Sequence, residues 1–163
     1  MGKVDIYKSI VDNNILSEFE TQRGVCLLGH SANSNFIDDF ISAAYILCPN
    51  FIEVDGHVFH EHFYNSTVEN ALASLEGLKK QFNNDKKHIE QWINSTCFGD
   101  FFIGKDCKSM DNDKILYQFG DILVYFWTQR LKELFPDRKF IVEYGDDIPG
   151  EEGWLAITMY EVT

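Results

Sequence analysis

The segments DKILYQFGDILVYFWTQRLKEL (113–134), FIVEY (140–144) and WLAITMY (154–160) decide the predicted fold. In the first segment apolar residues recur every three or four positions, which predicts a long helix that Asp111 or Asp113 caps and Pro136 ends. The other two segments are short and rich in β-branched and aromatic residues, and an acidic loop joins them. They predict an antiparallel hairpin after the helix.

A second hairpin is predicted upstream, where Asp55-Gly56 separates FIEV (51–54) from HVFH (57–60). Residues 25–28 form an apolar run that predicts a short strand or a buried turn. Apolar periodicity predicts further helices at residues 4–11, near 15–19, and at 36–47, 66–82 and 85–93. We therefore predict a single α+β domain over residues 1–163, with a small antiparallel sheet of two hairpins and helices packed on one face.

The composition is typical of a globular chain, because 45% of the 163 residues are hydrophobic and 15% are aromatic. The start of the chain has no apolar run of signal-peptide length, and the longest apolar stretches are too short to span a bilayer. We therefore expect a cytoplasmic protein without membrane contact. The four cysteines form no CxxC pair, and three have apolar neighbours, which predicts buried thiols.

Charge is distributed unevenly along the chain. Residues 24–78 carry seven acids and residues 140–163 carry six, and neither stretch contains lysine or arginine. The net charge is −12. A charge of this sign repels nucleic acid and membranes and speeds encounter with basic proteins, so we expect a basic protein partner and no nucleic acid.

The predicted partner-binding residues belong to these acidic stretches. The main group surrounds the loop between the last two strands, where we expect exposed aromatic side chains beside the acids. Two further acids occupy the first turn of the predicted helix 36–47, where they also complement the helix dipole. The full set is Glu143, Asp146, Asp147, Glu151, Glu152, Tyr144, Trp154, Asp38 and Asp39.

Two other groups of residues support the alternative of a small metal-dependent or hydrolytic enzyme. His57, His60 and His62 could ligate zinc or nickel, but a strand points His57 away from the other two, and solvent-facing hairpin residues are the alternative. The segment VCLLGHS (25–31) resembles the strand–turn–helix of α/β-hydrolases that exposes a nucleophilic serine, here Ser31. No later histidine fits the triad order, so a simple strand-to-helix turn is the alternative for Ser31.

The C-terminal third resembles small bacterial proteins of unknown function that have a tryptophan-bearing helix, a Phe-Pro stop and a hairpin ending in an aromatic residue. The residues that carry this resemblance are Trp127, Leu131, Phe135, Pro136, Lys139, Phe140, Glu143, Tyr144, Ile157, Thr158 and Tyr160. In size and acidity the chain is also similar to immunity proteins that neutralise bacterial toxins. This similarity, which concerns only size and acidity, implies a basic toxin as the partner. It assigns no role to any single residue.

The leading hypothesis is a non-enzymatic, acidic protein-binding module, of the kind that immunity or inhibitor proteins use against a basic toxin. It requires no cofactor, no metal and no catalytic residue. The small enzyme described above is one alternative. The other is a structural protein whose C-terminal hairpin pairs edge to edge with a second copy as a homodimer.

Overall fold

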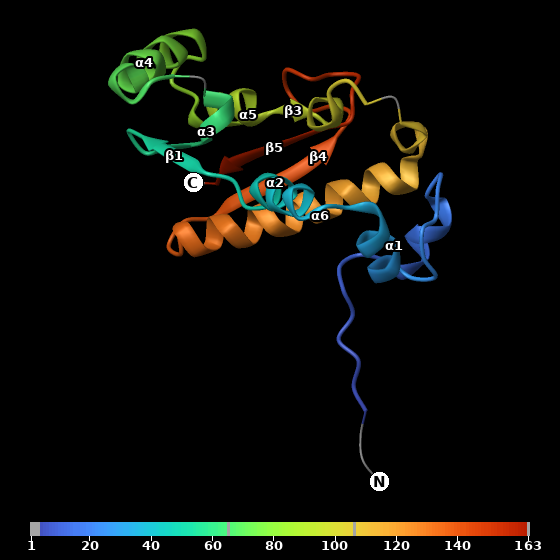
Figure 1. Cartoon of the computed structure of the whole chain (residues 1–163). Helices are drawn as coiled ribbons and strands as arrows, with labels where there is room; N and C mark the ends of the chain where they lie inside the picture. The colour runs from blue at the N-terminus through green and yellow to red at the C-terminus, as the bar shows by residue number, and fades with distance from the viewer. Residues whose placement is uncertain (1–3, 65, 106, 163) are drawn as a thin grey trace.

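The computed structural model describes residues 4–64, 66–105 and 107–162 (Figure 1). The elements follow in the order η1 (Asn13–Glu18), α1 (Leu27–Ser34), α2 (Ile37–Leu47), β1 (Phe51–Val54), β2 (His57–His60), α3 (Glu61–Tyr64), η2 (Val68–Asn70), α4 (Ala71–Gln81), α5 (Lys86–Asn94), β3 (Thr96–Cys97), η3 (Phe98–Phe102), η4 (Lys108–Asp111), α6 (Asp113–Leu134), β4 (Phe140–Gly145) and β5 (Ala156–Glu161), where η denotes a 3₁₀ helix. The predicted α+β class is confirmed. Among the described residues, no helix has the length and apolar character needed to cross a membrane.

Both predicted hairpins are present, and they belong to separate antiparallel sheets. Strands β1 and β2 pair from Phe51 with His60 to Val54 with His57. Asp55 and Gly56 turn the chain with φ of 46° and 77°, as a two-residue hairpin loop requires. The second sheet has the order β3–β5–β4, and its two-residue strand β3 was not predicted from the sequence.

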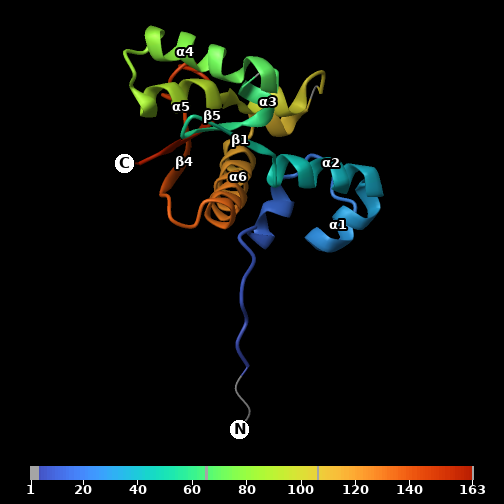
Figure 2. The ribbon, with the colours of Figure 1, turned by 90° about the vertical axis from the view of Figure 1, so that its left-hand side faces the viewer.

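Helix α6 lies on one side of the strands, and α4 and α5 lie on the other (Figures 1 and 2). The core beneath the strands packs Leu123 and Trp127 of α6 against Ile157 of β5 and Val58 of β2, and all four side chains are buried. A second core packs Phe59 of β2 against α4 and α5. Because successive residues of a strand point to opposite faces, β2 contributes to both cores.

Helix α5 connects the two sheets through polar side chains that are fully buried. Glu90 accepts hydrogen bonds from the backbone N–H groups of Val58 (2.9 Å) and Glu161 (2.7 Å). Asn94 lies one turn later, where it accepts from the N–H of His60 (2.8 Å) and donates to the carbonyls of Val58 (3.0 Å) and Met159 (3.1 Å). These two side chains therefore satisfy backbone groups of β2 and β5 that have no strand partner there.

The structure corrects several predictions for the first fifty residues. Residues 4–9 are extended rather than helical, and Tyr7 is 93% exposed. The run 25–28 forms neither a strand nor a buried turn, because Val25 is exposed and α1 begins at Leu27. The prediction of buried thiols is also wrong, since Cys26, Cys48 and Cys107 are exposed and Cys97 is half-buried.

Helix α2 is present as predicted, but only its last residues, Ile46 and Leu47, pack against a core. Neither α1 nor α2 contains a buried residue. The exposed apolar side chains of this region are those of Val25, Leu28, Phe36, Ile37, Phe40, Ile41 and Tyr45. Isolated apolar side chains are normal on a surface, but Ile37, Phe40, Ile41 and Tyr45 recur at helical spacing on α2, and such an exposed apolar helix face is typical of an interaction surface. We refer to these seven residues as the α2 face.

A salt-bridge network at the end of β5 makes folding stability sensitive to acid. The guanidinium of Arg138 donates to Glu161 through Nε (2.9 Å) and Nη2 (2.8 Å), and Lys86 also contacts this carboxylate. Hydrogen bonds from Arg138 are the main cause that lowers the pKa of Glu161 from 4.5 to about 2. A lowered pKa stabilises the fold above the unfolded-state pKa, and this contribution is lost as the pH falls towards the folded-state value.

We therefore expect the free energy of unfolding of the wild type to fall between about pH 5 and about pH 2.5. The Glu161→Gln variant should be less stable than the wild type at about pH 5 and lose less stability across this window, because it has no carboxylate to protonate. Urea unfolding at both pH values measures the difference. Glu133→Gln, at an exposed ion pair with Arg130, is the matched control. An unchanged pH dependence in Glu161→Gln would contradict the assignment.

Candidate functional site

The loop between β4 and β5 is held in place along most of its length. Ile148 is buried, and the hydroxyl of Ser95 donates to the carbonyl of Pro149 at 2.9 Å. Gly150 has φ of +90° and lies against the Trp92 ring, where a Cβ atom would be 3.5 Å from the ring. Within the loop, the N–H of Gly153 donates to the carbonyl of Asp146 at 3.0 Å. The acidic side chains of this loop are therefore carried by a defined backbone.

A cavity of about 460 Å³ lies beside this loop, between Cys97–Asp100, η4 and α6. Its wall contains three carboxylates, those of Asp100, Asp111 and Glu151, and the side chain of Trp154. Trp154 is 69% exposed. Burial, together with the negative charges of Asp100 and Glu152, raises the pKa of Glu151. We refer to this cavity as the acidic pocket.

The carboxylates of the acidic pocket, of the β4–β5 loop and of Glu143 on β4 have no basic partner within the described part of the chain. No ion pair there involves Asp100, Asp111, Glu143, Asp146, Asp147, Glu151 or Glu152. The acids near the β1–β2 hairpin differ, since Arg138 pairs with Glu53 and Lys79 pairs with Asp55. Positive and negative charges are thus matched at one end of the molecule and unmatched at the acidic pocket.

Three of the residues predicted around the last loop lie at this pocket. Glu151 and Trp154 line it, and Glu152 is close enough to Glu151 to influence its pKa. Asp146 and Asp147 are exposed at the start of the same loop. Glu143 is exposed on β4, opposite Thr158 of β5.

Tyr144 does not belong to this surface, so its predicted exposure beside the acids is wrong. Its ring packs so closely on α6 that a Cβ atom at Gly120 would lie 2.7 Å from it. Its hydroxyl donates to Asp121 at 2.9 Å. Burial, followed by the hydrogen bond to Asp121, raises the pKa of Tyr144 to about 12. This tyrosine therefore anchors β4 to α6.

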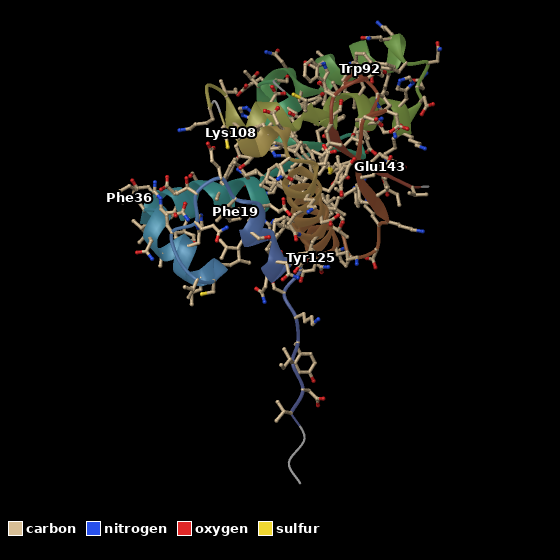
Figure 3. The ribbon with its side chains drawn as sticks, turned by 90° about the vertical axis from the view of Figure 1, so that its right-hand side faces the viewer. Phe19, Phe36, Trp92, Lys108, Tyr125 and Glu143 are labelled. Carbon is tan, nitrogen blue, oxygen red and sulfur yellow. The ribbon has the colours of Figure 1, made fainter. Side chains whose placement is uncertain are left out.

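Asp38 and Asp39 do not line the acidic pocket and lie in the first turn of α2. Asp39 accepts a hydrogen bond from the N–H of Phe36 at 2.8 Å and so helps to cap the helix. Figure 3 shows Phe36 and Glu143 at opposite sides of the molecule. Asp38 and Asp39, which follow Phe36, therefore lie on a different side of the molecule from Glu143, and they border the α2 face. The two acidic stretches meet elsewhere, where Arg138 pairs with both Glu53 and Glu161.

The three histidines of the alternative metal site do not converge. His57 and His60 are buried, with 7% and 5% of their surface exposed, so the expectation that they face solvent is wrong. The strand ends at His60, and His62 is an exposed residue of α3. No group of three potential ligands among histidine, cysteine, aspartate and glutamate occurs in the described residues.

Ser31 lies inside α1 and not at a strand-to-helix turn. Its hydroxyl oxygen accepts from the side-chain amide of Asn35 at 3.2 Å. The neighbouring His30 accepts from the N–H of Arg23 at 3.1 Å and contacts the Phe19 ring edge-on. The resemblance to a nucleophile elbow therefore does not extend to the structure.

Two residues of the acidic pocket were not among the predicted partner-binding residues. Asp111 was assigned to helix capping, but Asn112 caps α6 through the N–H groups of Lys114 and Ile115. Asp100 lies in η3, which follows β3. The signal that could have identified it is the carboxylate in the aromatic sequence FGDFF (98–102).

Comparisons with known proteins found no family model, no curated protein and no solved structure that matches this chain.

Proposed function

We propose that this chain is a protein-binding module that binds a basic protein through the acidic pocket and the loop beside it. One observation carries the proposal: three carboxylates without a basic partner line a pocket that also presents an exposed tryptophan, and the loop beside it carries further unpaired acids. Crowded like charges oppose one another, and a cationic side chain placed among them relieves that repulsion.

The expected contact is a lysine or arginine side chain of the partner that enters the acidic pocket. Asp100, Asp111 and Glu151 would accept its hydrogen bonds, and charge-assisted bonds of this type are stronger than neutral ones. The Trp154 ring offers both a cation–π surface and a large apolar area. Tryptophan is enriched among the residues that contribute most to protein interfaces, which supports Trp154 as the anchor.

The loop acids have a second expected effect, on the rate of association. Asp146, Asp147 and Glu152 are exposed and unpaired, so their potential extends into solvent. Complementary charge of this kind raises association rates at low salt and has less effect when salt screens it. A partner bound in this way should therefore be released as the ionic strength rises.

The α2 face supports binding to a protein rather than to a small cation. It supplies apolar side chains, which provide the buried area that protein interfaces need. Asp38 and Asp39 border this face and carry the same sign of charge as the acidic pocket. We place toxin neutralisation under the same proposal, because immunity proteins are often small and acidic and block a basic surface.

Affinity capture from the lysate of the cell that encodes the chain tests this function. We expect one stoichiometric basic protein to be retained at low salt and released at high salt. A homodimer alone, or no partner at either salt concentration, would contradict the proposal. If the partner is toxic when produced alone and harmless when co-produced with this chain, the immunity form of the proposal is supported.

A further inference from the structure

A second cavity, which shares Asp100 with the acidic pocket, has the features of a small-molecule site. It has a volume of about 580 Å³, within the range of pockets that hold drug-sized ligands. Four parts of the chain converge on it: the end of α2, the β2–α3 junction, the α5–β3 junction and η3 with Ile103. We refer to it as the His60 cavity.

His60 provides the observation that points to a ligand. It lines the cavity, is 5% exposed, and its Nδ1 atom is buried without a hydrogen-bond partner. Its ring stacks on Phe63, with ring centroids 4.1 Å apart, and lies 5.4 Å from the ring of Trp127. A buried polar atom without a partner costs about 1–3 kcal/mol, so a bound molecule that completes this hydrogen bond would recover that energy.

The charge of His60 is fixed by its surroundings. Burial, with a smaller contribution from the nearby His62, lowers the pKa of His60 to about 4. The imidazole is therefore neutral near pH 7, with one N–H and one lone pair. A neutral ring does not attract anions, which leaves the charge preference of the cavity to its other lining residues.

Those other residues favour a flat, cationic ligand. The only aspartate or glutamate among the described lining residues is Asp100, which accepts from the Thr96 hydroxyl at 3.1 Å, and none of them is a lysine or arginine. Tyr45, Phe63 and Phe101 supply aromatic surfaces. Aromatic faces attract both flat rings and cations.

We infer that the His60 cavity binds a small planar aromatic molecule that carries an amidine or amine group. The ring would lie among the aromatic side chains, the cationic group would face Asp100, and a polar atom of the ligand would complete the hydrogen bonding of His60. An aromatic carboxylate of the same shape would be rejected by Asp100. This inference does not require the proposed protein partner, but a partner side chain in the acidic pocket and this ligand would compete for Asp100.

The test uses benzamidine as the probe and benzoate as its counterpart of opposite charge, with the purified full-length chain. Binding is followed by the NMR signals of the His60 imidazole and the Trp127 indole. We expect saturable shifts of both signals with benzamidine and none with benzoate. Asp100→Asn should weaken benzamidine binding about tenfold, the loss expected for one charge-assisted hydrogen bond. Asp111→Asn, which lines only the acidic pocket, should leave it unchanged.

A second variant keeps the inference falsifiable if Asp100→Asn does not fold. His60→Phe retains a buried ring and removes the unpartnered nitrogen, so it should fold at least as stably as the wild type and bind benzamidine about tenfold more weakly. Shifts with benzoate equal to those with benzamidine would overturn the inference. The inference would also be overturned if benzamidine caused no saturable shifts. It would be overturned as well if Asp100→Asn and Asp111→Asn lost the same affinity for benzamidine, or if His60→Phe bound benzamidine as tightly as the wild type.

Discussion

Replacing Asn94 by alanine is expected to lower the free energy of unfolding by at least about 3 kcal/mol. The truncation leaves the N–H of His60 and the carbonyls of Val58 and Met159 without their partner. Asn94 is fully buried where it contacts these three groups, so water does not take over the hydrogen bonds of the lost amide. Each such unsatisfied group costs about 1–3 kcal/mol, whereas the whole domain is stable by about 5–15 kcal/mol.

Urea unfolding followed by circular dichroism measures this effect, with Gln81→Ala as the control. Gln81 is exposed at the end of α4, so its replacement should change the stability by less than about 0.5 kcal/mol. A loss below about 1 kcal/mol for Asn94→Ala would mean that α5 does not join the two sheets as described.

The sequence predictions were accurate where the residues that specify an element are close together in the sequence. The β1–β2 hairpin was predicted because Asp55-Gly56 specifies its turn within two residues. Helix α6 was predicted over the observed residues 113–134 because its apolar pattern continues over many turns. The N-terminal segment has a similar spacing of apolar residues over 4–11, but it lies extended and exposed. A short helix is marginal without a surface to pack against, and the sequence does not show whether one is present.

The acidic pocket could be predicted only in part for the same reason. Glu151, Glu152 and Trp154 are close together in the sequence, so their common location was expected. Asp100 joins them only because β3 pairs with β5 and the N–H of Phe98 donates to the carbonyl of Leu155 at 2.9 Å. Strand β3 has only two residues, so the alternation of apolar and polar residues that predicts a strand cannot be detected in it. The packing of Tyr144 on α6 likewise depends on Gly120, which is distant in the sequence.

Neutralising the acidic loop is expected to have the largest effect on function. The loop variant combines Asp146→Asn, Asp147→Asn, Glu151→Gln and Glu152→Gln, which keep the shape of each side chain and most hydrogen-bond acceptors. The control variant combines Glu61→Gln, Glu69→Gln, Glu133→Gln and Asp137→Asn at other exposed positions. Each variant removes four acids and changes the net charge from −12 to −8. The two variants therefore lose the same net charge at different positions.

The most direct test of the proposed function is therefore the association rate of the captured basic partner with these variants, measured by stopped flow across a range of salt concentrations. At low salt we predict that the loop variant associates about tenfold or more slowly than the wild type, and that the control variant remains within about twofold. The steep salt dependence of the wild type should persist in the control variant and flatten in the loop variant. Equal rates and equal salt dependence for the two variants would show that only the net charge matters, and would contradict a binding site at the acidic pocket.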